Sequence, residues 1–179
     1  MDFLRRARVQ SGLDSMVGRT VVEFGSYDLN GTPRPAFGGA ASWTGVDWRP
    51  GPGVDVVGLA HEAPVASADV VVCCQMLEHD PHWQLTVARA CNLVRPAGGW
   101  LFFTWAGPGY VEHELDTAPD DGSGEAYYGN LSTLDVVRVV AETLRDADDV
   151  QVHTEYGRGT LDALMWVRVR TDRPGVLGG

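Results

Sequence analysis

The sequence predicts an α/β protein with a doubly wound, mostly parallel seven-stranded sheet and an antiparallel last strand. In the earlier part of the chain, apolar runs of strand length are separated by turn-rich and helical segments, a pattern typical of parallel strands joined by crossovers. Near the end, two strand-like segments at 150–156 and 162–170 are separated by the short turn 157–159, which contains two glycines. So short a link permits an antiparallel hairpin and excludes a parallel crossover.

The five earlier strands are predicted at 20–24, 43–48, 54–57, 68–74 and 100–105. The segment 68–74 is apolar at every position after Asp69, as expected for a central parallel strand that is covered on both faces. Pro33 and Pro35 disfavour a long helix that begins before Ala36. The first crossover should therefore be short or irregular.

Helices are expected in three places. Residues 2–17 alternate apolar side chains with arginines, which indicates a short, partly amphipathic helix or arm before the first strand. Asp80 followed by Pro81 is typical of an N-cap and first helical position, and apolar residues at helical spacing continue to Val94. Ser132, with an acid three residues later, resembles a capping box and predicts a third helix.

The length of 179 residues indicates one domain, 1–179, that is large enough to bury a core. Within it we expect an N-terminal arm at 1–19, a lid loop at 107–130 and a flexible tail at 171–179. The lid is expected because so long a polar, glycine-rich loop inside a compact domain is usually functional or disordered, and 107–130 also carries aromatics and acids. The tail is rich in glycine and proline.

Composition excludes several classes of function. The net charge of −10 argues against binding a nucleic-acid backbone, although most of this charge is expected to serve solubility. All 14 basic residues are arginine, so a lysine Schiff base, a pyridoxal phosphate linkage and a P-loop are excluded. No apolar run has the length of a membrane span, and no signal peptide is visible. We therefore expect a cytoplasmic protein, either monomeric or homodimeric.

Two acids mark the ends of the first two predicted strands. Glu23 ends the first strand and is followed at once by Gly25 and a turn-rich segment, while Asp47 ends the second. In open α/β sheets, ligands bind at the carboxyl edge of the strands. The interval between the two acids is close to that at which nucleotide-binding α/β units present an acid to a ribose hydroxyl.

These features resemble the cofactor motifs of class I S-adenosylmethionine-dependent methyltransferases, in the small-molecule branch with type 11-like motifs. Residues 68–79, ADVVVCCQMLEH, are similar to the fourth strand of that family and the Leu-Glu-His that follows it. Residues 93–103, LVRPAGGWLFF, are similar to its turn into the fifth strand. The resemblance covers roughly residues 20–169 and implies a Rossmann-like methyltransferase fold, S-adenosyl-L-methionine as cofactor and a small-molecule methyl acceptor. The chain departs from the family pattern at Tyr27, where a further glycine is common.

The resemblance also implies where the cofactor would bind. Glu23 would orient its methionine end, Gly25 would let the backbone pass close to it, and Asp47 would accept hydrogen bonds from the ribose hydroxyls. The full set of implied cofactor-binding residues is Glu23, Gly25, Tyr27, Asp47, Trp48, His61 and Gln75, in which Trp48 and His61 would contact adenine and Gln75 the methionyl group.

Methyl transfer needs alignment of the reacting atoms, and it needs a general base only when the acceptor must lose a proton. His79 and His113 are the candidates for that base, although surface or packing roles are more common for histidine. Acceptor contacts are predicted for His79, Trp105, Tyr110 and His113. His79 and His82 are not joined by further ligands at a familiar spacing, so no metal site is predicted.

Two other functions are compatible with parts of this pattern. A protein of the same fold could bind S-adenosylmethionine without catalysing transfer. A nicotinamide-dependent oxidoreductase is disfavoured, because no G-x-G-x-x-G follows the first strand and because a Rossmann dinucleotide fold lacks the final antiparallel hairpin.

Overall fold

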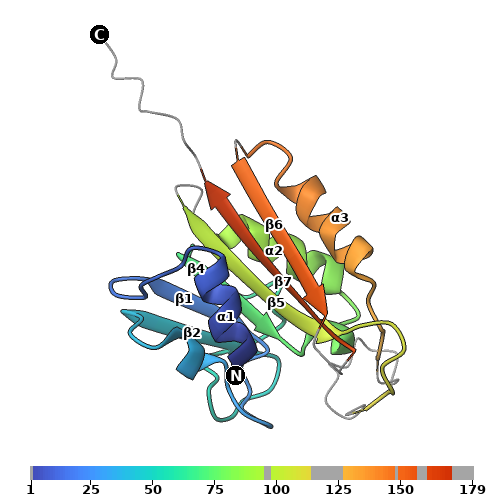
Figure 1. Ribbon diagram of the computed structural model, residues 1–179. Coiled ribbons are helices and arrows are strands. Elements are labelled where there is room, and N and C mark those ends of the chain that lie inside the picture. The colour runs from blue at the N-terminus through green and yellow to red at the C-terminus, as the bar shows by residue number, and fades with distance from the viewer. Residues whose placement is uncertain (1, 95–97, 114–126, 148, 157–160, 171–179) are drawn as a thin grey trace.

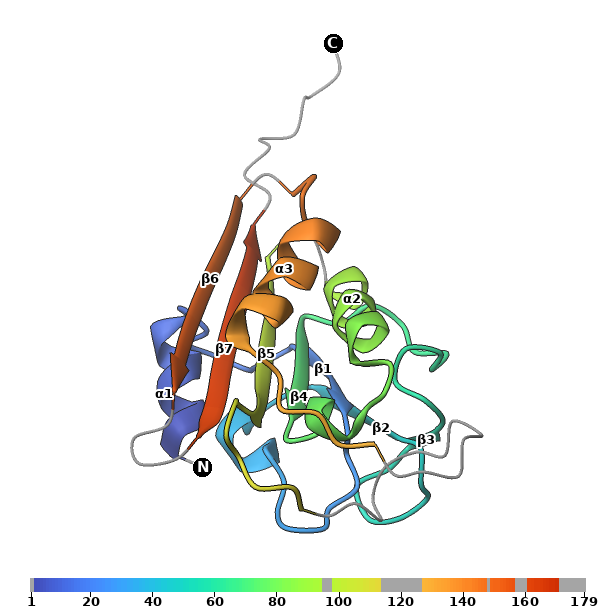
Figure 2. The ribbon, with the colours of Figure 1, turned by 90° about the vertical axis from the view of Figure 1, so that its right-hand side faces the viewer.

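The computed structural model describes residues 2–94, 98–113, 127–147, 149–156 and 161–170. They form one seven-stranded sheet in the order β3-β2-β1-β4-β5-β7-β6, with helices on both faces (Figures 1 and 2). The strands are β1 (Thr20–Phe24), β2 (Ser42–Asp47), β3 (Val56–Val57), β4 (Val70–Cys74), β5 (Gly99–Ala106), β6 (Asp149–Tyr156) and β7 (Asp162–Arg170).

The sheet is parallel from β3 through β5, and β7 pairs antiparallel with both β5 and β6. This confirms the predicted fold class, including the antiparallel last strand. The turn predicted at 157–159 lies outside the described residues. β3 is shorter than the predicted 54–57, because only Val56 and Val57 pair with β2.

The two faces of the sheet carry separate apolar clusters, as the alternation of side chains along a strand requires. Val70 and Val72 of β4 face α1 (Asp2–Gln10) and the 3₁₀ helix η1 (Arg34–Phe37). Val71 and Cys73 face α2 (Trp83–Leu93) and α3 (Thr133–Thr143). The central strands are thus buried on both faces, which matches the apolar composition of residues 70–74.

The first crossover contains only η1, in agreement with the effect expected of Pro33 and Pro35. The N-terminal helix ends at Gln10, so residues 11–17 of the predicted arm are not helical. The capping box of α3 is confirmed, since Ser132 is the N-cap and its Oγ accepts a hydrogen bond of 3.2 Å from the Asp135 amide.

The predicted N-cap at Asp80 is wrong. α2 begins two residues later than expected, at Trp83, and His82 is its N-cap residue. The Asp80 carboxylate instead accepts a hydrogen bond of 2.8 Å from the His82 amide and another from the Thr86 hydroxyl. The side chain therefore still caps donors at the start of the helix, but from outside it.

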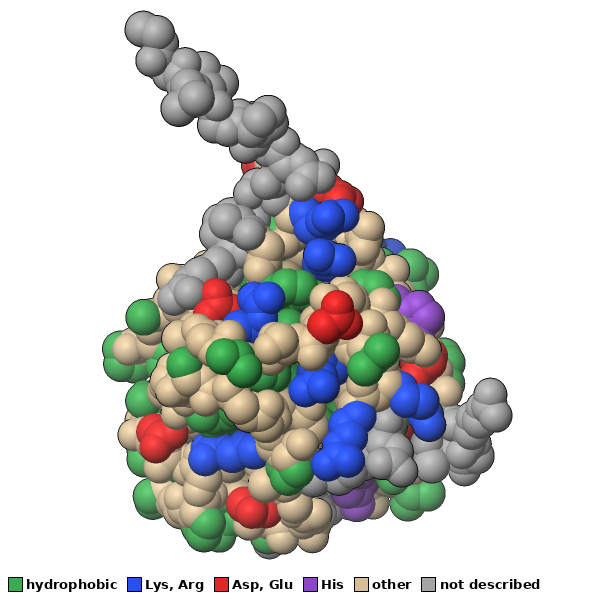
Figure 3. Space-filling model, turned by 60° about the vertical axis from the view of Figure 1, so that its left-hand side comes forward, with side chains coloured by type: hydrophobic (Ala, Val, Ile, Leu, Met, Phe, Trp, Pro, Cys, Tyr) green, Lys and Arg blue, Asp and Glu red, His purple; other side chains and the backbone are tan. Residues whose placement is uncertain are grey.

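On the face shown in Figure 3, basic side chains, which are all arginine in this protein, are interspersed with acidic and apolar ones. This face does not carry the continuous basic stripe that a nucleic-acid backbone requires. Among the residues that the structure describes, no helix combines the length and the apolar character needed to span a bilayer.

Candidate functional site

A cleft of about 690 Å³, open to solvent, lies at the carboxyl edge of the sheet. Four segments line it, each at or just after the carboxyl end of one of the strands β1, β2, β3 and β4. They contribute Gly25, Tyr27 and Leu29; Val46, Asp47, Trp48 and Arg49; Gly58, Leu59 and Ala60; and Gln75, Met76, His79 and Asp80. The sheet order brings β1 and β4 side by side, so segments far apart in the sequence meet here.

The backbone turns sharply just after β1 and β4, where the chain reaches the cleft. Gly25 has a φ of +73°, and a Cβ added to it would lie 2.6 Å from the Cβ of Met76. Glycine is required here both for its conformation and for this close approach. Gln75 also has a positive φ, +50°, and its amide donates a 2.8 Å hydrogen bond to the Thr104 carbonyl. A non-glycine residue held in this region is typical of functional sites.

The Asp47 carboxylate is fixed at the rim of the cleft by two backbone amides. Oδ2 accepts a hydrogen bond of 3.1 Å from the Tyr27 amide, and Oδ1 accepts one of 3.0 Å from the Arg49 amide. An ionised carboxylate has about four acceptor positions, so two remain for ligand hydroxyls. The carboxylate also ties the loop after β1 to the loop after β2.

An aromatic and cationic stack forms the same rim. The Arg49 guanidinium lies 4.6 Å from the centroid of the Tyr27 ring and 5.3 Å from that of the Trp48 ring. Gly51 lets the Tyr27 ring lie against the backbone, since a Cβ there would lie 2.1 Å from a ring carbon. The position of Tyr27, where the family commonly has a glycine, therefore has a structural role. Sequence reasoning missed Arg49, although it follows Asp47 and Trp48 directly.

Glu23 does not line the cleft. It is buried on the face of the sheet that α1 and η1 cover, where its Oε2 accepts hydrogen bonds from Trp43 Nε1 (2.7 Å) and Arg34 Nε (3.4 Å). Burial raises the pKa of Glu23 to about 7, and the bonds from Trp43 and Arg34 oppose this rise. Its predicted contact with the cofactor's methionine end stays a prediction.

Two further predicted site residues also lie outside the cleft lining. His61 is next to Ala60 of the lining, and its ring centroid is 5.1 Å from that of His82. Trp105 is fully buried in β5, where its Nε1 donates a 2.9 Å hydrogen bond to the Leu131 carbonyl. The surroundings of Trp105 are those of a core residue.

Beside the cleft, the remaining predicted acceptor residues gather into one cluster. His79, in the 3₁₀ helix η2 (Leu77–His79), lines the cleft and lies 5.4 Å from His113, centroid to centroid. Tyr110 and Tyr128 each lie 5.2 Å from the His113 ring. The described parts of the predicted lid, 107–113 and 127–130, thus contact the cleft through His79, whereas 114–126 lie outside the described residues.

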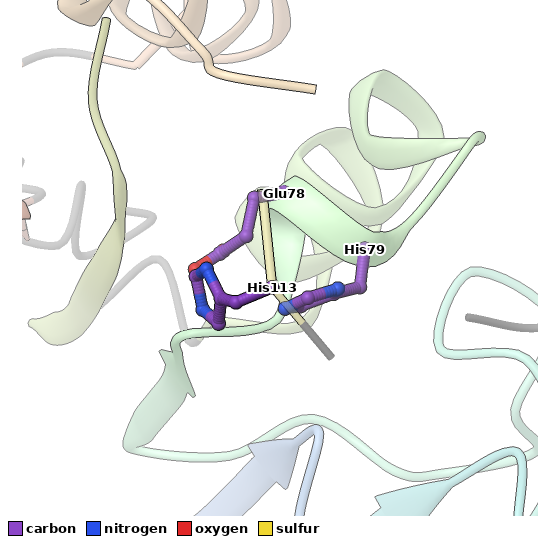
Figure 4. Close-up of side chains that lie close together, drawn as sticks. All are labelled: Glu78, His79 and His113. Carbon is purple, nitrogen blue, oxygen red and sulfur yellow. The ribbon is translucent and has the colours of Figure 1, made fainter. Parts of the chain in front are cut away.

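Glu78 belongs to the same cluster (Figure 4), and the sequence prediction did not include it. The side chains of Glu78, His79 and His113 place potential ligand atoms within 4.8 Å of one another. Burial raises the pKa of Glu78 to about 7, against hydrogen bonds from backbone amides that lower it. No spacing in the sequence indicates this set, because His113 belongs to a different loop.

The sheet order, the antiparallel β7 and the cleft at the carboxyl edge define the class I methyltransferase fold. Solved structures of that class have the same fold. Magnesium protoporphyrin IX methyltransferase from Synechocystis PCC 6803, with S-adenosylmethionine bound, superposes with a TM-score of 0.61 over 95% of this chain and 79% of its own, at 11% identity. A protein from Listeria monocytogenes assigned as an S-adenosylmethionine-dependent methyltransferase superposes with a TM-score of 0.63. The superposition covers 96% of this chain and 100% of that protein, at 10% identity.

Sequence similarity to curated proteins is local. Ubiquinone biosynthesis O-methyltransferase from Paracidovorax citrulli is 49% identical over 51 residues, which are 28% of this chain and 21% of that protein. The enzyme of the same name from Bordetella pertussis is 44% identical over 66 residues, 37% and 25% respectively. The match thus spans only about a fifth to a quarter of these relatives, and no protein-family model matches the chain. The predicted resemblance to class I methyltransferases is confirmed, in fold over most of the chain and in sequence over a local stretch.

Proposed function

We propose that this protein transfers a methyl group from S-adenosylmethionine to a small-molecule acceptor by in-line displacement. The observation that carries the proposal is the cleft at the ends of β1, β2 and β4, which is lined by Gly25 and Asp47, two residues that the family resemblance implies for cofactor binding. A structure of the same fold holds S-adenosylmethionine. The proposal takes residues 1–179 as one catalytic domain.

Different cleft residues would bind different parts of the cofactor. The two free acceptor positions of Asp47 suit the vicinal hydroxyls of a ribose, and the half-buried indole of Trp48, which lines the cleft, suits a flat purine. The close backbone approach at Gly25 and the turned backbone at Gln75 leave room for the methionine end. When bound, S-adenosylmethionine supplies an electrophilic methyl group on a positive sulfonium.

Oxygen is the acceptor atom that the local sequence matches favour, since both relatives named above are O-methyltransferases. The acceptor would lie near His79, which lines the cleft and joins it to the His113 cluster. Tyr110 would border this region through its contact with His113. The acidic net charge and the mixed surface of Figure 3 further support a small molecule rather than a nucleic acid as partner.

Calorimetry followed by a turnover assay tests the proposal. The protein should bind S-adenosylmethionine and S-adenosylhomocysteine, whereas NADH should give no heat of binding. Formation of S-adenosylhomocysteine should then depend on an added hydroxylated acceptor, supplied as a panel of phenols and hydroxy acids. Binding of NADH alone would overturn the proposal. Cofactor binding without turnover across the panel would favour the alternative of a cofactor-binding protein.

A further inference from the structure

Glu78, His79 and His113 form a set of three side chains of metal-ligating type beside the cleft, which His79 lines. Glu78 and His79 belong to η2 after β4, and His113 comes from the loop after β5. Figure 4 shows the imidazoles of His79 and His113 and the carboxylate of Glu78 converging on one another. One potential ligand atom from each lies within 4.8 Å of the others, and both Glu78 and His79 are buried.

The Glu78 carboxylate has one oxygen engaged and one unsatisfied. Oε1 accepts a 3.1 Å hydrogen bond from the Ala106 amide, which fixes the orientation of the group. Oε2 is buried and has no hydrogen-bond partner among the described residues. Leaving a buried carboxylate oxygen unpaired is costly, so such an atom in a native structure needs a partner that satisfies it.

His113 is oriented as metal-binding histidines commonly are. Its Nδ1 lies 3.0 Å from the Val111 carbonyl oxygen and 3.2 Å from the Tyr128 hydroxyl. A carbonyl can only accept, so in this contact Nδ1 carries the proton and the lone pair is on Nε2. A hydrogen bond from the second ring nitrogen to a carbonyl fixes the tautomer and the ring plane of a metal ligand.

We propose that Glu78, His79 and His113 bind a divalent transition-metal ion. Two imidazole nitrogens and one carboxylate oxygen suit Zn²⁺, and three protein ligands leave a fourth position open. Ligand atoms around tetrahedral zinc lie roughly 3.3 Å apart, given bond lengths of about 2.0–2.1 Å. Separations of up to 4.8 Å must therefore shorten by up to about 1.5 Å on binding. Glu78 and His79 belong to η2, whereas His113 lies on the loop after β5, so we expect His113 to make most of this movement.

The role of this ion rests on the proposed function. Because His79 also lines the cleft, the open position faces the acceptor region. If the acceptor hydroxyl occupied the open position, the ion would lower its pKa, so that its proton would pass to solvent water near neutral pH. The acceptor oxygen would keep the electron pair and form the new bond to the methyl carbon, while the electrons of the broken carbon–sulfur bond would stay on the sulfur of the cofactor product. No protein side chain then has to act as the general base.

Metal binding can be measured without cofactor or acceptor. Untagged, chelator-treated protein is titrated with Co²⁺, and the visible absorption bands of tetrahedral Co²⁺ report the site, followed by competition with Zn²⁺. We expect one equivalent to bind in wild type, with affinity at least about tenfold lower in Glu78→Gln and in His113→Gln, since each removes a ligand. Glu78→Gln keeps an oxygen acceptor for the Ala106 amide, so it should fold.

His153→Gln is the matched control, since His153 stacks on Trp166 in the sheet and lies outside the cluster. It should bind Co²⁺ as wild type does. Absence of the absorption bands in wild type, or wild-type affinity in both folded ligand variants, overturns the inference. If the bands appear but no acceptor is methylated, the site stands and the proposed function fails. If chelator-treated protein methylates an acceptor as fast as the metal-loaded protein does, the proposed function stands and the proposed role of the ion fails.

Discussion

Replacing Gly25 by alanine tests how closely the ends of β1 and β4 must approach to form the cleft. A left-handed backbone costs a non-glycine residue about 1–2 kcal/mol. At Gly25 the new Cβ would also lie 2.6 Å from the Cβ of Met76, an atom fixed to the backbone that no rotamer can remove. Overpacking of this kind adds about 1–3 kcal/mol, so we expect a loss of roughly 2–5 kcal/mol in unfolding free energy.

Gly18 provides a control with the same backbone strain and no steric conflict. Its φ is +77°, against +73° at Gly25, and a Cβ there would meet nothing within 4 Å. Gly18→Ala should therefore cost only about 1–2 kcal/mol in urea unfolding. Because Gly25 and Met76 both line the cleft, Gly25→Ala should also weaken S-adenosylmethionine binding at least about tenfold, or 1.4 kcal/mol, while Gly18→Ala leaves it unchanged.

Comparing these two variants tests whether the close approach of the β1 and β4 ends is needed for the cleft. Equal destabilisation by Gly18→Ala and Gly25→Ala, with wild-type cofactor affinity in both, would refute the reasoning. Such a result would mean that the strand ends can separate without changing the cleft.

Three other perturbations follow from the described contacts. Asp47→Asn should raise the calorimetric Kd for S-adenosylmethionine about 10- to 150-fold, because a hydrogen bond to a charged group contributes about 1.5–3 kcal/mol. The control is Asp55→Asn, since the Asp55 carboxylate accepts a hydrogen bond from the Gly45 amide outside the cleft lining; this variant should keep the wild-type Kd. Equal affinities would remove Asp47 from the site. The folded pKa of Glu23, about 7, lies above its ordinary value of 4.5, so its stabilisation is full below about pH 4.5 and is lost as pH rises through 7. Urea unfolding of Glu23→Gln should accordingly show a weaker fall in stability between pH 5 and 8 than wild type, and an unchanged slope would contradict this. Trp105→Phe should lower the unfolding free energy by about 1–3 kcal/mol, because it leaves the buried Leu131 carbonyl unpaired, and it should not change the rate of methyl transfer. Loss of methyl transfer at unchanged stability would instead support the predicted acceptor contact of Trp105.

The sequence predicted the sheet well because its strongest signals are local. An apolar run such as 70–74 has few alternatives to a buried strand, and the short link before 162 leaves only an antiparallel hairpin. The cleft residues Gly25, Asp47 and Gln75 were found because strand ends are visible as the points where apolar runs stop.

Other features depend on the direction of a side chain or on a partner that is distant in the sequence, and local patterns do not show either. Glu23 shares a face with Val21, opposite Val22 and Phe24, so the pleat turns it toward Trp43 rather than into the cleft. Asp80 has the local signature of an N-cap, but α2 begins only after His82. The approach of Glu78 to His113 depends on how the loop after β5 returns over η2, which no local pattern specifies.

The place of β7 within the sheet has a consequence for assembly. β7 follows β6 in the chain but lies between β5 and β6, and every residue of β5 from Gly99 to Ala106 pairs with it. A nascent chain can therefore form the β1–β2–β3 half early, whereas β5 keeps an unpaired edge until residues 162–170 have left the ribosome. Pairings so distant in sequence form slowly, and an exposed, largely apolar edge strand is a template for aggregation. Truncation before Asp162 should thus leave the five parallel strands β3, β2, β1, β4 and β5 with an unpaired β5 edge, and we expect such a shortened variant to aggregate.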